Sequence, residues 1–167
     1  MSKQGLKIAK EHAGGLPRFE SLADAERTLF AKRERLLRRL QEAAGSSPVV
    51  QLDYSPESLK RLEAWYFRLL RDSFDAVGIG REEFEQAVSM YLGEVLSKSI
   101  ARVEWSVTES VFAPGHYEIG VRRPRVFGLM LTGRTNLEMT PNNKRHQSMW
   151  RSFRQYAKVY GANPTGI

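Results

Sequence analysis

The stretch REEFEQAVSMYLGEVLSKSIARVEWSV, residues 81–107, changes its hydrophobic period from that of a helix to that of a strand. Up to Val95 the apolar side chains recur every three or four residues, whereas residues 103–107 alternate between apolar and polar. The stretch therefore predicts a helix over 81–99 that is followed by a half-buried strand. This succession favours an α+β architecture over the repeated βαβ units of a doubly wound fold.

Two further amphipathic helices are predicted before this stretch. The first covers 21–45, where Ser21 and Asp24 have the spacing of a capping box and leucines follow at helical intervals. The second covers 55–77, where Ser55 is a good N-cap before a proline at the first helical position. Each of these helices has one apolar face, so each is expected to pack against the rest of the domain.

Short strands are predicted at 49–52, 117–121 and 126–131, and a last helix begins at the Thr140 N-cap. The short connections between the late strands indicate antiparallel pairing. The expected fold class is α+β, with helices packed on one side of a small, mainly antiparallel, curved sheet.

The chain has 167 residues, which suits one domain over 21–167. Paired glycines and a proline within residues 1–20 predict a flexible or extended N-terminal arm. There is no cysteine, no apolar run long enough to span a membrane and no secretory signal, so a cytoplasmic address is expected. The composition also excludes disulfides and thiolate-ligated metals.

Lysine and arginine outnumber the acidic residues 26 to 19, which gives a formal net charge of +7. A basic excess of this size favours encounters with polyanions or acidic proteins, although it also serves simple solubility. The distribution of the cations therefore matters more than their number.

Basic residues gather on one flank of the predicted last helix. At 100° per residue, the side chains in this sector are those of Lys144, Arg151, Arg154 and Lys158. Such a flank suits contact with phosphates, and Arg122, Arg123 and Arg125 would extend it if the sheet edge lies nearby. The alternative is a solvated helix surface, since no known nucleic-acid-binding motif accompanies these residues.

Two glutamates interrupt apolar helix faces. Glu63 projects between leucine and phenylalanine on the helical wheel, and Glu94 lies at the edge of the apolar face of the next helix. If they meet, they could share a proton or hold a cation. Structural pairing is the simpler explanation, either with Arg102 or Arg122 or, for Glu94, with Lys98 one turn later.

Gly93 stands in the middle of the helix over 81–99, where glycine costs about 1 kcal/mol relative to alanine. Something is therefore expected to pack closely against this turn. A tight helix crossing is favoured over the close approach of a ligand.

Familiar catalytic patterns are missing from the sequence. The three histidines, His12, His116 and His146, lack the spacing of metal ligands, and no nucleophile elbow, P-loop or dinucleotide fingerprint follows a strand. No metal, no cofactor and no catalytic residue is therefore predicted, and an enzymatic role is disfavoured.

The segments LDYSPESL (52–59) and YLGEV (91–95), together with Trp105, resemble a pattern of uncharacterised bacterial α+β domains. The resemblance extends over about residues 52–160. It implies cytoplasmic bacterial proteins without an assigned reaction, some of which act as immunity or accessory proteins that bind another protein. This chain departs from a neutraliser of basic toxins in being basic itself, so an acidic partner is expected.

Three functions follow from these observations. The first is a non-enzymatic domain that binds a protein partner or a second copy of itself. The second is a nucleic-acid-binding protein that uses the basic flank of the last helix. The third is a small-ligand binder or enzyme built on Glu63 and Glu94.

Overall fold

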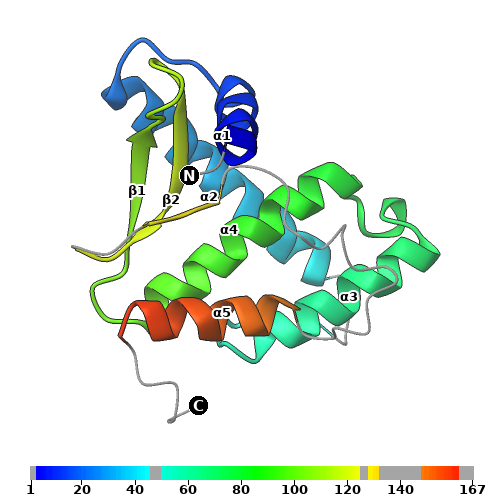
Figure 1. Ribbon diagram of the computed structural model, residues 1–167. Helices are drawn as coiled ribbons and strands as arrows, with labels where there is room; N and C mark the ends of the chain where they lie inside the picture. The colour runs from blue at the N-terminus through cyan, green and yellow to red at the C-terminus, as the bar shows by residue number, and fades with distance from the viewer. Residues whose placement is uncertain (1–2, 46–49, 125–127, 132–147, 162–167) are drawn as a thin grey trace.

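The computed structural model describes residues 3–45, 50–124, 128–131 and 148–161 (Figure 1). Its helices are α1 (Lys3–Gly14), α2 (Leu22–Gly45), α3 (Ser58–Asp72), α4 (Arg81–Ser99) and α5 (Ser148–Val159), with a 3-10 turn η1 (Asp75–Val77). The strands β1 (Glu104–Glu109), β2 (Tyr117–Arg122) and β3 (Leu129–Met130) form one antiparallel sheet in the order β1-β2-β3. The predicted α+β fold class is confirmed.

The starts of α2 and α3 follow from local capping. The Ser21 hydroxyl accepts a hydrogen bond from the Asp24 N–H at 3.1 Å, which satisfies one of the otherwise unpaired donors of the first turn of α2. In the same way the Ser55 hydroxyl accepts from the Ser58 N–H at 3.2 Å. The chain turns tightly from Ser55 and becomes α-helical at Ser58, three residues after the predicted cap.

The sheet packs against α2 and α4, and this layer holds the centre of the core (Figure 1). On β1 and β2, Val107 lies opposite Ile119 and Trp105 opposite Val121. Glycine is required at position 120, because a Cβ there would overlap the backbone of Leu129 on β3. α5 lies across α3 and α4 on the outside of the molecule.

Gly93 lets the sheet approach α4 closely. A Cβ at this position would overlap Leu131 Cδ1 and lie 2.5 Å from Cη2 of Trp105. The expected close packing is confirmed, but the neighbours are a strand tryptophan and Leu131 rather than a crossing helix. The sequence could not show this, because the contact depends on how the sheet folds back over α4.

The N-terminal residues differ from the expected arm. α1 covers Lys3–Gly14, so the glycines that suggested irregular backbone stand at the end of a helix. The next residues run beside the β1–β2 hairpin, where the Tyr117 N–H donates to the Pro17 carbonyl and the Phe19 N–H donates to the Gly115 carbonyl. Ala13 and Leu16 are buried there.

Two other predictions concern a strand over 49–52 and the start of the last helix. The strand predicted over 49–52 is absent from residues 50–52, although Val50 and Leu52 are buried as that prediction required. The side-chain amide of Gln41 satisfies the Leu52 carbonyl at 2.9 Å in place of a neighbouring strand. The predicted start of the last helix at Thr140 lies outside the described residues.

In the part of the chain that the structure describes, no helix is long and apolar enough to cross a membrane.

Replacing Gly93 with alanine tests the packing of the sheet on α4. We expect a net loss of about 1–2 kcal/mol in the free energy of unfolding, because overpacking outweighs the gain of about 1 kcal/mol in helix propensity. Urea denaturation measures the change. Gly45→Ala is the matched control, since a Cβ there meets nothing within 4 Å. An unchanged or raised stability of Gly93→Ala would show that Trp105 does not press on this turn.

Candidate functional site

The two motif segments meet in a closed hydrogen-bond network. The Tyr54 N–H donates to the Tyr91 hydroxyl oxygen at 2.8 Å, and the Ser58 hydroxyl donates to the Ser55 carbonyl at 2.6 Å. Tyr91 Oη and Ser58 Oγ are 2.7 Å apart, so the Tyr91 hydroxyl must donate to Ser58. Burial raises the pKa of Tyr91 to about 12, which keeps the phenol neutral. The network therefore anchors the loop before α3 on α4.

Tyr54 has a left-handed backbone, with φ at 59°, which is unfavourable for a residue with a large side chain. Its ring stacks on the ring of Tyr91 with centroids 4.9 Å apart, and the Lys98 ammonium lies 3.9 Å from the centroid of the Tyr54 ring. These contacts hold the strained residue in place.

Glu94 joins α4 to both α2 and β1. Its carboxylate accepts from Trp105 Nε1 at 3.0 Å and from the Arg33 guanidinium at 3.3 Å, and the Lys98 ammonium is 3.6 Å away. The predicted pair with Lys98 is confirmed. Arg33 also stacks on the Trp105 ring, with its Cζ 4.6 Å from the centroid. The side chain of Glu94 is 13% exposed and meets three donors, so its environment is that of a structural link.

Glu63 is 3% exposed and binds the start of α5. One carboxylate oxygen accepts from the Ser148 N–H and the other from the Met149 N–H, both at 2.9 Å. The first N–H groups of a helix have no partner within the helix and carry its positive dipole end, so a carboxylate is well placed there. The sequence had suggested Arg102 or Arg122 as the partner of Glu63, but the described hydrogen bonds of its carboxylate come from the backbone of α5 instead.

Glu63 and Glu94 share no hydrogen-bond or ion-pair partner among the described residues. Each carboxylate is occupied by donors from other elements. The described contacts therefore do not assemble the paired-carboxylate site that the sequence raised as one hypothesis.

Glu85 is a further buried carboxylate, and the sequence pattern did not indicate it. It accepts from the Tyr66 hydroxyl at 2.7 Å and from Arg81 Nε at 2.9 Å. Burial and the nearby carboxylate raise the pKa of Tyr66 well above its usual range. The four-residue spacing from Arg81 to Glu85 was a visible signal, but the tyrosine comes from another helix.

The side chains of Arg151, Arg154 and Lys158 are exposed on α5. Two cations lie near the ring of Trp150, with Arg154 Cζ at 5.2 Å and the Lys60 ammonium at 4.8 Å from its centroid. Lys144 and Arg125 of the predicted flank lie outside the described residues.

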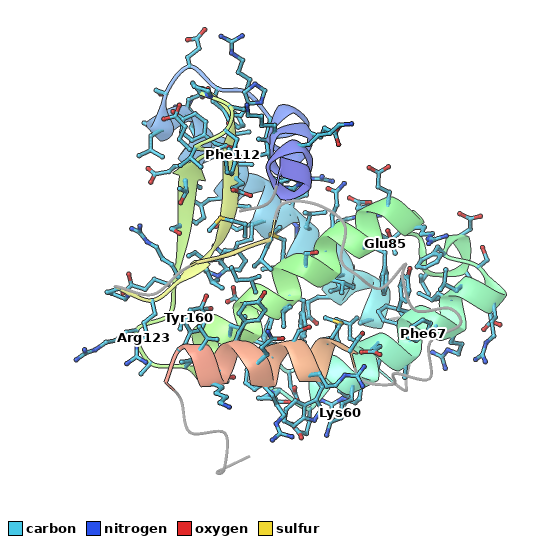
Figure 2. All side chains as sticks on the ribbon, in the orientation of Figure 1. Lys60, Phe67, Glu85, Phe112, Arg123 and Tyr160 are labelled. Atoms are coloured by element: carbon cyan, nitrogen blue, oxygen red, sulfur yellow. The ribbon has the colours of Figure 1, made fainter. Side chains whose placement is uncertain are left out.

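The end of α5 is fixed to the sheet edge. Tyr160 Oη donates to the Val121 carbonyl at 3.1 Å and accepts from the Leu129 N–H at 3.2 Å. Arg123 follows β2 here, close to Tyr160 (Figure 2), and a Cβ on Gly161 would lie 3.1 Å from its guanidinium. Arg122 is exposed at the end of β2. We call the surface formed by Lys60, Arg123, Arg151, Arg154 and Lys158 the basic face.

The charge of the chain is strongly asymmetric, a signal that the net charge alone conceals. Nine of the 26 lysines and arginines follow residue 118, but one of the 19 acidic residues does. Residues 119–167 therefore carry +8 and residues 1–118 carry −1. The basic face draws four of its five members from this C-terminal part.

The described residues contain no group of three or more histidine, aspartate or glutamate side chains that could hold a metal ion. His116 Nδ1 lies 2.7 Å from the Leu16 carbonyl, and His12 lies 3.8 Å from Glu118. Burial raises the pKa of Glu118, and the nearby His12 opposes this effect. His146 lies outside the described residues.

Replacing Glu63 with glutamine tests the link between α3 and α5. We expect a loss of about 1–3 kcal/mol in the free energy of unfolding, because an amide N–H₂ would face a helix N–H and the favourable negative charge would disappear. Amide hydrogen exchange should accelerate in the variant relative to the wild type, and it should accelerate more in α5 than in the other helices. Glu104→Gln is the control, since Glu104 is exposed. If α5 keeps its protection in Glu63→Gln, the carboxylate does not hold this helix.

The contacts of Asp53, in the loop before α3, predict that the stability of the fold depends on pH. The Ser55 hydroxyl and N–H, together with Arg61, hold the pKa of Asp53 below 3.8. The contribution of Asp53 to the stability of the fold is complete above pH 3.8, the ordinary pKa of its carboxyl. It is lost as the pH falls through the lower pKa that this carboxyl has in the folded state. Because the side chain is half exposed, we expect Asp53→Asn to remove less than about 1 kcal/mol at pH 7. Thermal unfolding between pH 2 and 7 should show a smaller acid-side decline in the variant than in the wild type, and parallel curves would contradict this assignment.

Comparison with known sequences identifies relatives of this chain. A protein of Bacillus subtilis (strain 168), described as uncharacterized protein YwmA, is 28% identical over 126 residues, which cover 75% of this chain and 80% of that protein. No match was found among solved structures. The family described as uncharacterised protein YwmA matches residues 18–157, which include α2 to α4, the whole sheet and most of α5. The predicted resemblance to an uncharacterised bacterial α+β family is therefore confirmed, and the chain belongs to the YwmA family.

Proposed function

We propose that this chain is a non-enzymatic binding domain that engages an acidic partner protein through the basic face. The observation that carries the proposal is the gathering of cations around Trp150 on the exposed side of α5. Arg123, Arg154 and Lys158 form no ion pair with a carboxylate among the described residues. Their charges therefore remain available to a partner.

The aromatic and apolar members of this surface favour a protein partner. Trp150 is partly exposed beside two cations, and Val159 on the same helix is 53% exposed. Tryptophan and arginine are enriched among the residues that dominate protein interfaces. An exposed valine adds contact area with a protein but nothing to a phosphate contact.

A second copy of this chain is a poor partner for the basic face. In a two-fold symmetric dimer the same patch meets itself, so Arg154 and Lys158 would face like charges. Attraction requires a surface of opposite charge. The partner is therefore expected to be a different and acidic protein.

Nucleic acid is the second candidate, and a different observation favours it. Arg151, Arg154, Gln155 and Lys158 occupy positions i, i+3, i+4 and i+7, which share one side of α5. No acidic residue follows Glu138 in the sequence. Such a row of donors suits a phosphate backbone, and binding of that kind falls steeply as salt rises.

An enzymatic role built on Glu63 and Glu94 has less support. Both carboxylates accept hydrogen bonds that tie separate elements together, and neither has an unused oxygen facing a described cavity. A catalytic base would have to break such contacts to act.

Affinity capture from a nuclease-treated bacterial lysate tests the proposal. The wild type is compared with the variant Arg151→Ser, Arg154→Ser, Lys158→Ser. We expect the wild type to retain an acidic protein that the variant loses, because the interface would lose three cations. The control variant Lys10→Ser, Arg27→Ser, Arg38→Ser loses the same charge from α1 and α2 and should retain it.

Fluorescence anisotropy with a labelled mixed-sequence RNA and DNA pool, at low and near-physiological salt, decides between the two partners. Micromolar binding at physiological salt that is lost in the α5 variant would replace the protein proposal with the nucleic-acid one. Equal capture by both triple variants, with no nucleic-acid binding, would contradict any role of the basic face.

A further inference from the structure

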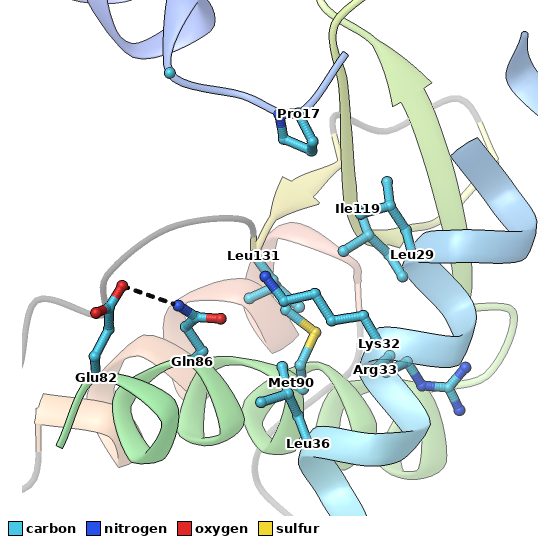
Figure 3. A pocket seen from close by; sticks show the side chains of 11 residues that line it. Pro17, Leu29, Lys32, Arg33, Leu36, Glu82, Gln86, Met90, Ile119 and Leu131 are labelled. Carbon is cyan, nitrogen blue, oxygen red and sulfur yellow. Dashed lines mark hydrogen bonds between the residues drawn. The ribbon is translucent and has the colours of Figure 1, made fainter. Parts of the chain in front are cut away.

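A cavity of about 230 Å³ lies between α2, α4, β2 and the segment that leaves α1 (Figure 3). Its floor is formed by apolar side chains that are buried in the core. These are Leu29 and Leu36 of α2, Met90 of α4, Ile119 of β2, and Leu131. A space with such a floor favours the apolar part of a ligand.

Two cations, Lys32 and Arg33, line this cavity. Figure 3 shows the Lys32 side chain reaching from α2 across the floor toward Leu131 and Met90. The ammonium has no hydrogen-bond or ion-pair partner within the described part of the chain. The neighbouring Arg33 turns its guanidinium away, toward the Glu94 and Trp105 contacts already described. The unpaired positive charge of Lys32 therefore lies beside the apolar floor.

The opposite side of the cavity is polar. Gln86 donates to Glu82 through its side-chain amide at 3.4 Å, and both residues line the cavity (Figure 3). The Glu82 carboxylate would repel a second negative charge on a ligand. A molecule with one negative charge near Lys32 is the best electrostatic match.

The walls are held by the fold. The Pro17 carbonyl accepts from the Tyr117 N–H at 3.0 Å, which ties the wall formed by Gly15 and Pro17 to β2. The Leu131 N–H donates to the Ile119 carbonyl at 2.9 Å, so these two floor residues are also fixed to each other. The cavity is therefore preorganised, which lowers the cost of binding.

The volume limits the size of the ligand. An engineered apolar cavity of about 150 Å³ holds benzene. A space of about 230 Å³ admits an aromatic ring or branched aliphatic group with a few more heavy atoms.

We propose that this cavity is a binding site for a small organic monocarboxylate with an aromatic or branched apolar body. The apolar body lies on Leu29, Met90 and Ile119, and the carboxylate accepts hydrogen bonds from the Lys32 ammonium. This site is independent of the basic face and of Glu63.

Methyl-detected NMR titration of the full chain with phenylacetate tests the site, with 2-phenylethanol as an uncharged analogue of similar shape. We expect saturable shifts of the Leu29, Met90 and Ile119 methyl groups with a Kd of about 1 mM or lower. Lys32→Gln should weaken phenylacetate binding about tenfold and leave 2-phenylethanol binding nearly unchanged, because the variant removes the charge and spares the floor.

Arg38→Gln is the matched control, since Arg38 is another exposed cation of α2 outside the cavity lining. It should bind phenylacetate as the wild type does. The proposal is overturned by the absence of saturable shifts in the wild type up to about 10 mM, by equal binding in Lys32→Gln, or by 2-phenylethanol binding as tightly as phenylacetate.

Discussion

The packing of Trp105 against Gly93 is the contact on which the architecture depends. The indole ring of β1 reaches the backbone of α4 because no side chain stands at residue 93, and its N–H then donates to Glu94 one residue later. Arg33 of α2 stacks on the same ring and binds the same carboxylate. One tryptophan thus sets the position of the sheet relative to both central helices, and the cavity lined by α2, α4 and β2 follows from that arrangement.

Buried carboxylates join the helices of this domain. Glu63 of α3 binds the first N–H groups of α5, Glu85 of α4 binds Tyr66 of α3, and Glu94 of α4 binds Arg33 and Trp105. A charge removed from water is costly unless it is paired, so each glutamate requires its partner element to stay in place. This gives specificity to the arrangement of helices, and it occupies the groups that would otherwise suggest acid–base chemistry.

The two candidate binding regions have different chemistry and different origins in the chain. The basic face lies on α5, the sheet edge and α3, and four of its five cations come from the C-terminal third of the sequence. The cavity lies between the N-terminal segment, α2, α4 and β2, and it combines an apolar floor with the Lys32 ammonium. A protein partner and a small acid could therefore bind at the same time, since the two proposed regions share no residue.

Local physical rules, read from the sequence, were enough to predict several elements. Helix α4 begins and ends at the predicted residues Arg81 and Ser99, and the alternation around Trp105 predicted β1, because hydrophobic period and capping act within a few residues. The basic flank of α5 was also visible as a helical spacing.

The sequence suggested that Glu63 and Gly93 needed partners but could not identify them, since the α5 N–H groups and the Trp105 ring are brought there by chain segments distant in sequence. The same holds for the buried Val50 and Leu52, where packing against other elements prevailed over local strand propensity. The sequence by itself therefore determined the main helices, the antiparallel strands and the charge, because these depend on neighbours along the chain. The tertiary structure alone decided which carboxylates are paired and where a cavity remains, because these depend on side chains that meet only after folding.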